Sequence, residues 1–441
     1  MSTLNPGLQW RPTNAPAASS RTDDIWFLDP SIGWAVNSNG QILMTTNGGK
    51  SWHEQFRSSA YLRCVGFANQ SKGWVGTVSG AERLYHTSDG GQTWEPVTNL
   101  PTVAPSAICG LCVVNESVIY ASGTNYPNRP PRMINSLDGG QTWTGWEMNK
   151  YATLLVDTFF TSPTQGWVVG GKAEVANPKR ENVKPVVLYT EDGGQTWINR
   201  VANLQEEFPF GEWGWKIQFL NDSVGFVSLE NFNAGAILKT IDGGVTWVRK
   251  QVNDPQRNAN LEGVGFVDER HGWVGGWGTA DFSGGFTSET LNGGDNWQNA
   301  NTVGRFINRF RFFGNPVNVG FASGRTVFKY SSEPVVPGPS MLVGPTQILD
   351  TNEPMECAGA IEITYTAPRS ARRVQIDIWD RFGDHVRKLY EETNPHPGRH
   401  SLTWDCKSDA GSSLPPGIYI YRITIDHAAE SRVVRLKAEE R

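Results

Sequence analysis

The chain has 441 residues, including 48 glycines and 18 tryptophans, and only 19% of them are charged. With a net charge of −5, nothing in the composition suggests that the protein binds nucleic acid. No run of about 18 apolar residues occurs, so no membrane insertion is expected. The N-terminus lacks a basic and then apolar secretory signal. We therefore expect a cytoplasmic protein, export without such a signal, or a leader outside this sequence.

Six near-copies of one turn sequence, here called boxes, recur along the chain. Residues 87–94 read Thr-Ser-Asp-Gly-Gly-Gln-Thr-Trp, and relatives occupy 45–52, 136–143, 190–197, 240–247 and 290–297. The third residue can accept hydrogen bonds from backbone N–H groups, and the two glycines accept positive φ. We assign a structural role to these third residues, which are Asn47, Asp89, Asp138, Asp192, Asp242 and Asn292.

The spacing of the boxes predicts a β-propeller. The box tryptophans are 42, 49, 54, 50 and 50 residues apart, which is typical of four-stranded propeller blades. Between boxes, a β-rich run precedes a polar turn and then a Gly-Trp or Gly-Phe pair, such as Gly73-Trp74. Each blade should contain an inner strand, a Gly-Trp strand, a third strand that enters the box, and an outer strand.

The ends of the repeat region predict how the ring closes. Residues 306–330 supply three strands but no box, whereas the segment around Trp10 resembles the segment around Trp94. Trp10 also lies 42 residues before Trp52, at the spacing of a box tryptophan. We predict a seven-bladed propeller over residues 1–332, with the N-terminal strand completing the last blade and leaving no free sheet edge.

A second all-β domain follows the propeller. Residues 333–342 form a proline-rich connector, which cannot continue a sheet ladder. Within residues 343–441, period-two alternation predicts strands over 361–365, 373–379, 400–404, 417–423 and 431–436. Several short strands in such a span predict a small β-sandwich.

The five cysteines give no complete metal site. Cys64 lies in an apolar strand, which favours a buried thiol. Cys109 and Cys112 have the spacing of half a zinc site, but no second pair accompanies them, so we predict no metal and no cofactor. Cys357 and Cys406 share the second domain and could form a disulfide, an alternative that the sequence leaves open.

The second domain resembles a known family. Asp380-Arg-Phe-Gly383, Gly398 to Asp405, Asp409-Ala-Gly411 and Pro416 to Arg422 resemble the immunoglobulin-like domain of flagellar hook-capping proteins. Type IX secretion sorting domains share much of this pattern. The resemblance implies an immunoglobulin-like sandwich that presents a surface to a neighbouring subunit or to export machinery.

The boxes resemble the Asp-box (BNR-type) repeats of sialidases, sortilin-type receptors, xyloglucanases and the photosystem II stability and assembly factor family. Thr45 to Trp52 and Ile307 to Phe313 resemble the last family most closely. That resemblance implies a non-catalytic protein that binds assembly intermediates. This chain departs from the family pattern at Asn47 and Asn292 and by its second domain, which favours a general assembly or scaffold role.

Catalysis by glycosidase chemistry is the alternative that the boxes raise. Sialidases require an arginine triad that begins in an Arg-Ile-Pro motif, which this chain lacks. Xyloglucanases of this class use an Asp from each of two propellers, and one propeller is predicted here. We therefore predict a non-enzymatic protein whose partners are protein subunits of a larger assembly. The alternative is a carbohydrate-binding protein or a divergent sialidase-like glycoside hydrolase.

Two groups of residues are candidates for partner binding. Basic residues near the inner-strand starts could form a patch at one channel mouth, or could pair with Asp23, Asp24, Asp157 or Glu262 of other blades. These basic residues are Arg63, Lys216, Arg305, Arg309 and Arg311. Aromatic residues in long loops could anchor a partner, or could pack over their own blades. They are Phe208, Phe210, Trp213, Trp215, Trp277 and Phe282.

Overall fold

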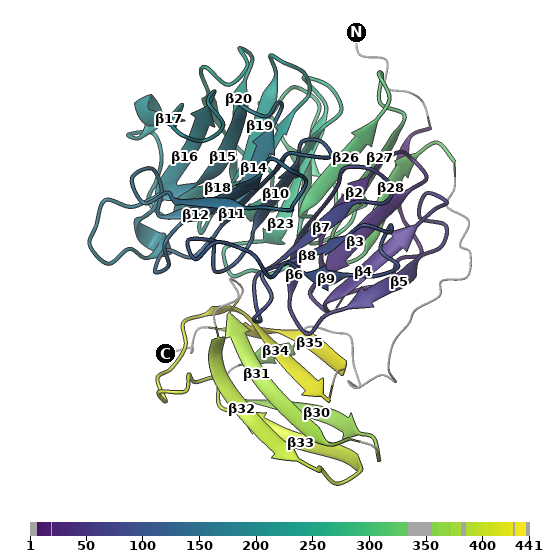
Figure 1. Cartoon of the computed structure of the whole chain (residues 1–441). Coiled ribbons are helices and arrows are strands. Elements are labelled where there is room, and N and C mark those ends of the chain that lie inside the picture. The colour runs from purple at the N-terminus through teal and green to yellow at the C-terminus, as the bar shows by residue number, and fades with distance from the viewer. Residues whose placement is uncertain are drawn as a thin grey trace.

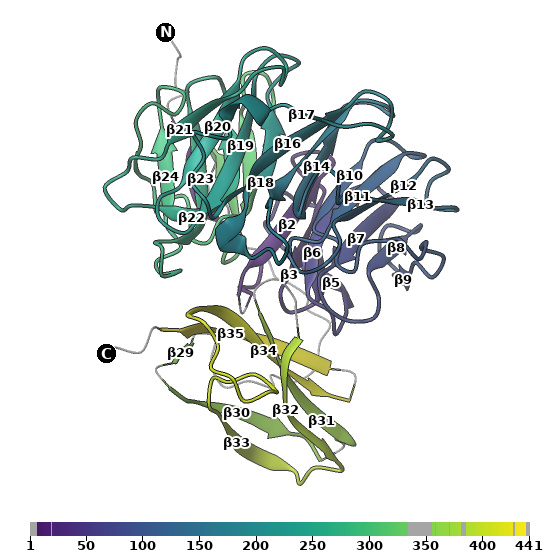
Figure 2. The same ribbon diagram turned by 90° about the vertical axis from the view of Figure 1, so that its left-hand side faces the viewer.

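A computed structural model describes residues 7–18, 20–333, 355–357, 359–369, 371–380, 385–426 and 428–437. Seven four-stranded sheets form a ring, and a smaller group of strands lies against one face of that ring (Figure 1, Figure 2). The predicted seven-bladed propeller with an immunoglobulin-like sandwich is therefore confirmed. Apart from Glu333, the predicted connector over 333–342 lies outside the described residues. None of the helices in the described ranges has the length and apolarity needed to cross a bilayer.

Each blade consists of four antiparallel strands, ordered from the channel outward. Blade 1 contains β2 (Thr22–Phe27), β3 (Gly33–Asn37), β4 (Gln41–Thr45) and β5 (His53–Arg57). Blade 2 contains β6 (Leu62–Phe67), β7 (Gly73–Thr77), β8 (Leu84–Thr87) and β9 (Glu95–Pro96). Blade 3 contains β10 (Gly110–Val113), β11 (Ile119–Gly123), β12 (Arg132–Ser136) and β13 (Thr144–Glu147).

Blades 4 to 6 repeat this order, and blade 4 is followed by short 3-10 turns. Blade 4 contains β14 (Leu154–Phe160), β15 (Gly166–Lys172), β16 (Lys184–Thr190) and β17 (Ile198–Asn199), with η1 (Arg180–Asn182) before β16 and η2 (Ala202–Leu204) after β17. Blade 5 contains β18 (Glu212–Phe219), β19 (Gly225–Asn231), β20 (Ala236–Thr240) and β21 (Val248–Gln251). Blade 6 contains β22 (Ala259–Phe266), β23 (Gly272–Gly278), β24 (Thr287–Thr290) and β25 (Gln298–Asn299).

The last blade joins the two ends of the propeller sequence. Blade 7 contains β26 (Arg309–Phe313), β27 (Val319–Ser323), β28 (Val327–Ser331) and, as its outer strand, β1 (Gln9–Pro12). Trp10 pairs with Tyr330 in the antiparallel register. Its ring lies 5.5 Å from Trp273 of blade 6 and 6.1 Å from Phe312 of blade 7. Trp10 thus takes the place that a box tryptophan takes between the other blades, as the spacing predicts.

The Gly-Trp pairs explain how neighbouring blades pack. A Cβ on Gly73 would lie 2.5 Å from the Phe67 ring of the same blade, so only glycine leaves room for that ring. Trp34 of the preceding blade then stacks on Phe67, with ring centroids 3.6 Å apart. The box tryptophan Trp94 meets the edge of Phe67 at 5.8 Å. This junction therefore buries a layer of aromatic rings, which bring a large hydrophobic contribution to stability.

The boxes close tight turns as the sequence predicts. Asp89 accepts hydrogen bonds from the Thr93 backbone N–H at 2.9 Å and from the Thr93 hydroxyl at 2.7 Å. These bonds lower the pKa of Asp89 to about 2. Gly90 and Gly91 have φ of 76° and 87°, in the left-handed region. Asn47 keeps the same bond, since its Oδ1 accepts the Ser51 N–H at 2.9 Å. The boxes lie on the face where the inner strands end, which we call the box face.

The second domain pairs a two-stranded sheet with a larger one. The small sheet contains β30 (Ile361–Ala367) and β33 (Gly398–Trp404). The larger sheet has the order β29 (Met355–Cys357), β35 (Ala428–Leu436), β34 (Gly417–Ile425), β31 (Arg373–Asp380) and β32 (His385–Thr393). The sequence does not predict β32, because its residues are mostly polar and charged. Such composition is usual in an edge strand, since it discourages pairing with another chain.

We expect Trp10→Ala to destabilise the protein by about 3 kcal/mol, because the substitution leaves a cavity among the rings that close the propeller. Urea unfolding should show this loss, and Trp197→Ala should cost a similar amount because Trp197 is a box tryptophan. Phe210→Ala is the control, because Phe210 is 67% exposed. A wild-type stability for Trp10→Ala would show that the N-terminal strand does not close the ring.

Candidate binding surfaces

β-Bulges bring charged side chains to the channel mouth at which the inner strands begin. The inner strands of blades 1, 2, 4, 5 and 6 all show a register shift near their starts. A bulge inserts an extra residue and re-aims its side chain. In blades 1, 2 and 6 the inserted residues are Asp23, Arg63 and Glu262. The alternation of apolar and polar residues along these strands does not indicate that bulges turn the charged side chains into the channel.

The first group of ion pairs joins blades 1, 2 and 6. Arg21 Nε lies 3.0 Å from Asp23 Oδ1, and the same guanidinium contacts the Glu262 carboxylate. Arg63 Nη1 lies 2.9 Å from the shared Asp23 Oδ1. All four side chains are buried. Buried charges persist only when they are paired, so these contacts fix the relative positions of the three blades.

A second group joins blades 1, 4, 5 and 7. Arg309 Nε lies 3.0 Å from Asp24 Oδ1, and its Nη2 lies 2.8 Å from Asp157 Oδ1. Lys216 Nζ lies 3.8 Å from Asp157 Oδ1. Burial alone would raise the pKa of Asp157, but Arg309 and Lys216 outweigh it and hold that pKa at about 2. Asp157 is therefore an anion at neutral pH that pairs with Arg309 and lies near Lys216, whose own pKa is lowered by burial and by Arg309.

The predicted basic patch is therefore not an open surface in this structure. Arg63, Lys216 and Arg309 are buried and paired with acids of other blades, as in the alternative interpretation. Arg305 donates to the Gly284 carbonyl at 2.6 Å, and Arg311 donates to the Ile25 carbonyl at 3.3 Å. Burial lowers the pKa of Arg311 to about 10, with Arg309 adding to the effect. A role for these residues in binding stays a prediction.

The predicted loop aromatics are mostly buried. Trp213 lies in β18 and Trp277 in β23, so neither belongs to a loop. Trp215 also lies in β18, and its indole donates to Asn308 at 3.1 Å. Phe208 packs in the core between blades 4 and 5. Only Phe210 is strongly exposed, and Lys184 Nζ lies 4.7 Å from its ring centroid.

The sandwich covers this channel mouth. Side chains of β34 alternate between two buried faces: Tyr419 and Tyr421 enter the core of the sandwich, whereas Ile418 and Ile420 pack on the propeller. The propeller side of this contact includes Trp277. The other propeller residues in it are Tyr61, Val78, Ala107, Cys109 and Phe282, with Phe232 and Phe306 at its edge. Figure 2 shows the sandwich directly against this face of the ring.

The opposite, box face is not covered by the sandwich (Figure 1, Figure 2). The second residue of three boxes is a large aliphatic side chain, namely Leu137 at 62% exposure, Ile241 at 70% and Leu291 at 44%. Val245, in the same box as Ile241, is 55% exposed. These exposed residues were not singled out from the sequence. The sequence does contain a signal for them, because the second box position varies and is Thr46, Ser88 and Glu191 in the other three boxes.

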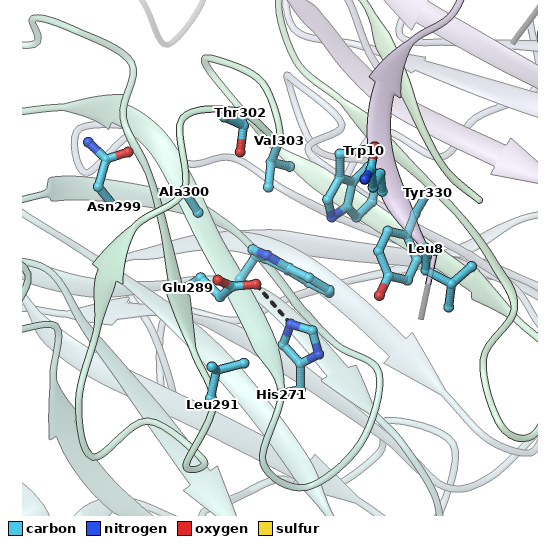
Figure 3. A pocket seen from close by; sticks show the side chains of 13 residues that line it. Leu8, Trp10, His271, Glu289, Leu291, Asn299, Ala300, Thr302, Val303 and Tyr330 are labelled. Carbon is cyan, nitrogen blue, oxygen red and sulfur yellow. Dashed lines mark hydrogen bonds and ion pairs between the residues drawn. The ribbon is translucent and has the colours of Figure 1, made fainter. Parts of the chain in front are cut away.

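A pocket of about 640 Å³ lies where the ring closes, between blades 6 and 7. Figure 3 shows Trp10 and Tyr330 on the blade 7 side and Glu289 and His271 on the blade 6 side. His271 Nε2 and Glu289 Oε1 are 2.9 Å apart. Leu291 lies at the pocket's lower edge in this view. Through Leu291, the pocket therefore reaches the box face.

The cysteines of the propeller are engaged individually. Cys109 donates to Asn125 Oδ1 at 3.4 Å, and Cys112 donates to the Phe160 carbonyl at 3.7 Å. Burial raises the pKa of each of these thiols. Cys406 is disulfide-bonded, whereas Cys64, Cys109 and Cys112 are free. In the part of the chain that the structure describes, no group of three or more His, Cys, Asp or Glu side chains could hold a metal ion.

Known proteins resemble both domains. Residues 5–126 match the family model of photosynthesis system II assembly factor YCF48, and residues 351–429 match that of the FlgD Ig-like domain. Photosystem II assembly protein Ycf48 of Synechococcus sp. (strain JA-2-3B'a(2-13)) is 22% identical over 302 residues, covering 49% of this chain and 85% of the relative. Photosystem II assembly lipoprotein Ycf48 of Synechococcus sp. (strain CC9902) is 30% identical over 128 residues, covering 27% and 35%.

Solved structures share the fold. A structure described as YCF48 bound to D1 peptide has a TM-score of 0.52 at 18% identity, covering 74% of this chain and 97% of that one. The GH74 enzyme of Niastella koreensis has a TM-score of 0.54 at 13% identity, covering 97% of this chain and 67% of that one. The chain is an Asp-box propeller that resembles Ycf48, followed by a domain that resembles the FlgD immunoglobulin-like domain.

Asp157→Asn should lower the free energy of unfolding at pH 7 by about 3 kcal/mol, because Arg309 and Lys216 lose a buried counterion. The native pKa of Asp157, about 2, lies below its unfolded value. Its contribution is therefore present above about pH 4 and is lost as the pH falls towards about 2. Urea unfolding across this range should show a flatter pH profile for Asp157→Asn, whereas exposed Asp222→Asn should follow the wild type. Parallel profiles for Asp157→Asn and the wild type would contradict the pairing.

The double substitution Ile418→Ser and Ile420→Ser should release the sandwich from the propeller, because it removes two apolar side chains buried in the contact. Small-angle X-ray scattering should then show a larger radius of gyration than for the wild type. Val248→Ser is the control, since Val248 is 59% exposed on an outer strand. An unchanged radius of gyration in the double variant would show that these residues do not hold the domains together.

Proposed function

We propose that this protein is a non-catalytic, protein-binding subunit of a multi-protein assembly, and that its main partner docks on the box face. The observation that carries this proposal is the set of exposed aliphatic side chains on that face, Leu137, Ile241, Val245 and Leu291. Exposed apolar side chains gathered on one face can serve as anchors for a protein partner. Sugar-binding surfaces use aromatic platforms instead, and the aromatic rings named above are largely buried.

The similarity to Ycf48 supports a protein partner. The curated relatives are named assembly factors, and one solved relative of the same fold is bound to a D1 peptide. We propose that this chain likewise holds a segment of a partner protein. Because its own sandwich occupies the channel mouth, the face left for a large partner is the box face. The outer surface of the sandwich would provide a second contact.

Several acidic side chains are held as anions, which fits a non-catalytic role at those positions. A glycoside hydrolase needs a carboxylic acid whose pKa is raised, so that it stays protonated until it donates its proton. The surroundings of Asp157, Asp192 and Glu289 instead lower the pKa of each of these carboxyl groups. The box carboxylates are also committed to their own turns. This environment suits fixed anions rather than proton donors.

The test is affinity purification of the tagged full-length chain from its native source, with chemical cross-linking and mass spectrometry. We expect a protein partner in near-stoichiometric amount, cross-linked to the box face. The double variant Ile241→Ser and Val245→Ser should recover at least about tenfold less of that partner. Val175→Ser with Ile198→Ser is the matched control, since both residues are exposed and lie outside the boxes.

Two results would contradict the proposal. One is recovery of the partner at the same level with the Ile241→Ser and Val245→Ser variant as with the wild type. The other is strong, specific binding on a glycan array, or hydrolysis of xyloglucan or a fluorogenic sialoside, without any protein partner. Either result would favour the carbohydrate alternative or another surface of the molecule.

A further inference from the structure

The box turns of the propeller show what normally fills the junction between two blades. The second glycine of a box packs on the preceding blade, so a Cβ on Gly140 would meet the Trp74 ring and one on Gly244 the Trp167 ring. Side chains of the preceding blade also hold the box backbone. Lys329 Nζ, for example, donates to the Gly48 carbonyl at 3.1 Å. Each such junction is thereby closed by a turn of the chain.

The seventh junction has a different sequence. Thr3-Leu-Asn5-Pro6-Gly7-Leu-Gln-Trp10 matches the box at its Thr, Asn, second Gly and Trp positions, but proline replaces the first glycine. In the six boxes that first glycine has φ between 65° and 76°. The pocket between blades 6 and 7, with Gly7 and Trp10 in its lining, lies at this junction.

The pocket also carries a charge that the other junctions lack. In blades 5, 6 and 7, one residue of the third strand pairs with the aromatic residue of the Gly-Trp or Gly-Phe pair. This residue is Lys239 in blade 5, opposite Phe226, and Lys329 in blade 7, opposite Phe321. In blade 6 this residue is Glu289. Burial acts to raise the pKa of Glu289, but hydrogen bonds from His271 and Gln298 outweigh it and lower that pKa. Blade 6 therefore presents a carboxylate at the position where blades 5 and 7 present a lysine.

We propose that this pocket binds a lysine or arginine side chain inserted by a protein partner. The Glu289 carboxylate would pair with the cation, while Trp10, Trp273 and Tyr330 flank its alkyl chain and offer cation–π contacts. Leu291 at the rim connects the pocket to the box face. This inference rests on the proposed protein-binding function and adds the chemistry by which the partner is recognised.

The test uses short peptides, so that it does not depend on finding the native partner. Acetylated and amidated pentapeptides with a central Lys, Arg, norleucine or Glu between glycines are titrated into the full-length protein by isothermal titration calorimetry. We expect the Lys and Arg peptides to bind with Kd of about 1 mM, and the norleucine and Glu peptides to bind at least about tenfold more weakly.

Substitutions at Glu289 decide whether the pocket is responsible. Glu289→Gln should weaken the Lys peptide about tenfold, and Glu289→Lys should abolish its binding. Glu289→Lys should fold, because blades 5 and 7 carry lysine at this position, and its thermal unfolding is measured alongside. Glu95→Gln, on the outer strand of blade 2, is the matched charge control and should bind as the wild type does.

Three outcomes would overturn the assignment. They are equal binding of the norleucine and Lys peptides, unchanged binding of the Lys peptide by a folded Glu289→Gln protein, and no heat from the cationic peptides up to about 10 mM. The Ile241→Ser and Val245→Ser variant should keep its peptide binding. Failure of the pocket assignment and failure of the proposed box-face function therefore give different results.

Discussion

The stacking of aromatic rings between neighbouring blades is the interaction on which the rest of the structure depends. At each such contact an inner-strand phenylalanine packs on a glycine of its own blade and against an aromatic ring of the preceding blade. The closest examples are Phe67 with Trp34 and Phe266 with Phe226, each with centroids 3.6 Å apart. Closure extends the same layer across the chain ends, since Phe27 stacks on Phe321 at 3.7 Å. The ring thus has no junction without an apolar contact.

Within this ring, buried ion pairs hold the blades together at the channel mouth, and the sandwich domain packs over it. The cations and carboxylates at the mouth neutralise each other across blades, which makes a buried and rigid base. An apolar rim around that base accepts Ile418 and Ile420 of β34. In an isolated sandwich these side chains would face solvent. The second domain therefore occupies one face of the propeller, while the box face and the pocket between blades 6 and 7 are not covered by it.

Much of the fold follows from the sequence, because the repeat fixes both spacing and chemistry. The box tryptophans give the blade period, and the position of Trp10 gives the closure. The sequence does not show where a strand departs from the regular alternation of inward and outward side chains. The bulges that turn Asp23, Arg63 and Glu262 into the channel depend on contacts between blades far apart in sequence. Trp213 and Trp277 are likewise expected in long loops, but they lie in β18 and β23, because these two strands are longer than the sequence pattern indicates. The burial of both faces of β34 depends on how two domains meet, which no local pattern encodes.

The most direct test of the account is hydrogen–deuterium exchange of the full-length protein with and without its purified partner. If the partner docks on the box face, it should protect the box turns around Ile241 and Leu291, while the exchange of β34 and of the segment around Trp277 stays unchanged. Protection around Trp277 together with faster exchange in β34 would contradict it. That result would mean that the partner displaces the sandwich and binds at the channel mouth.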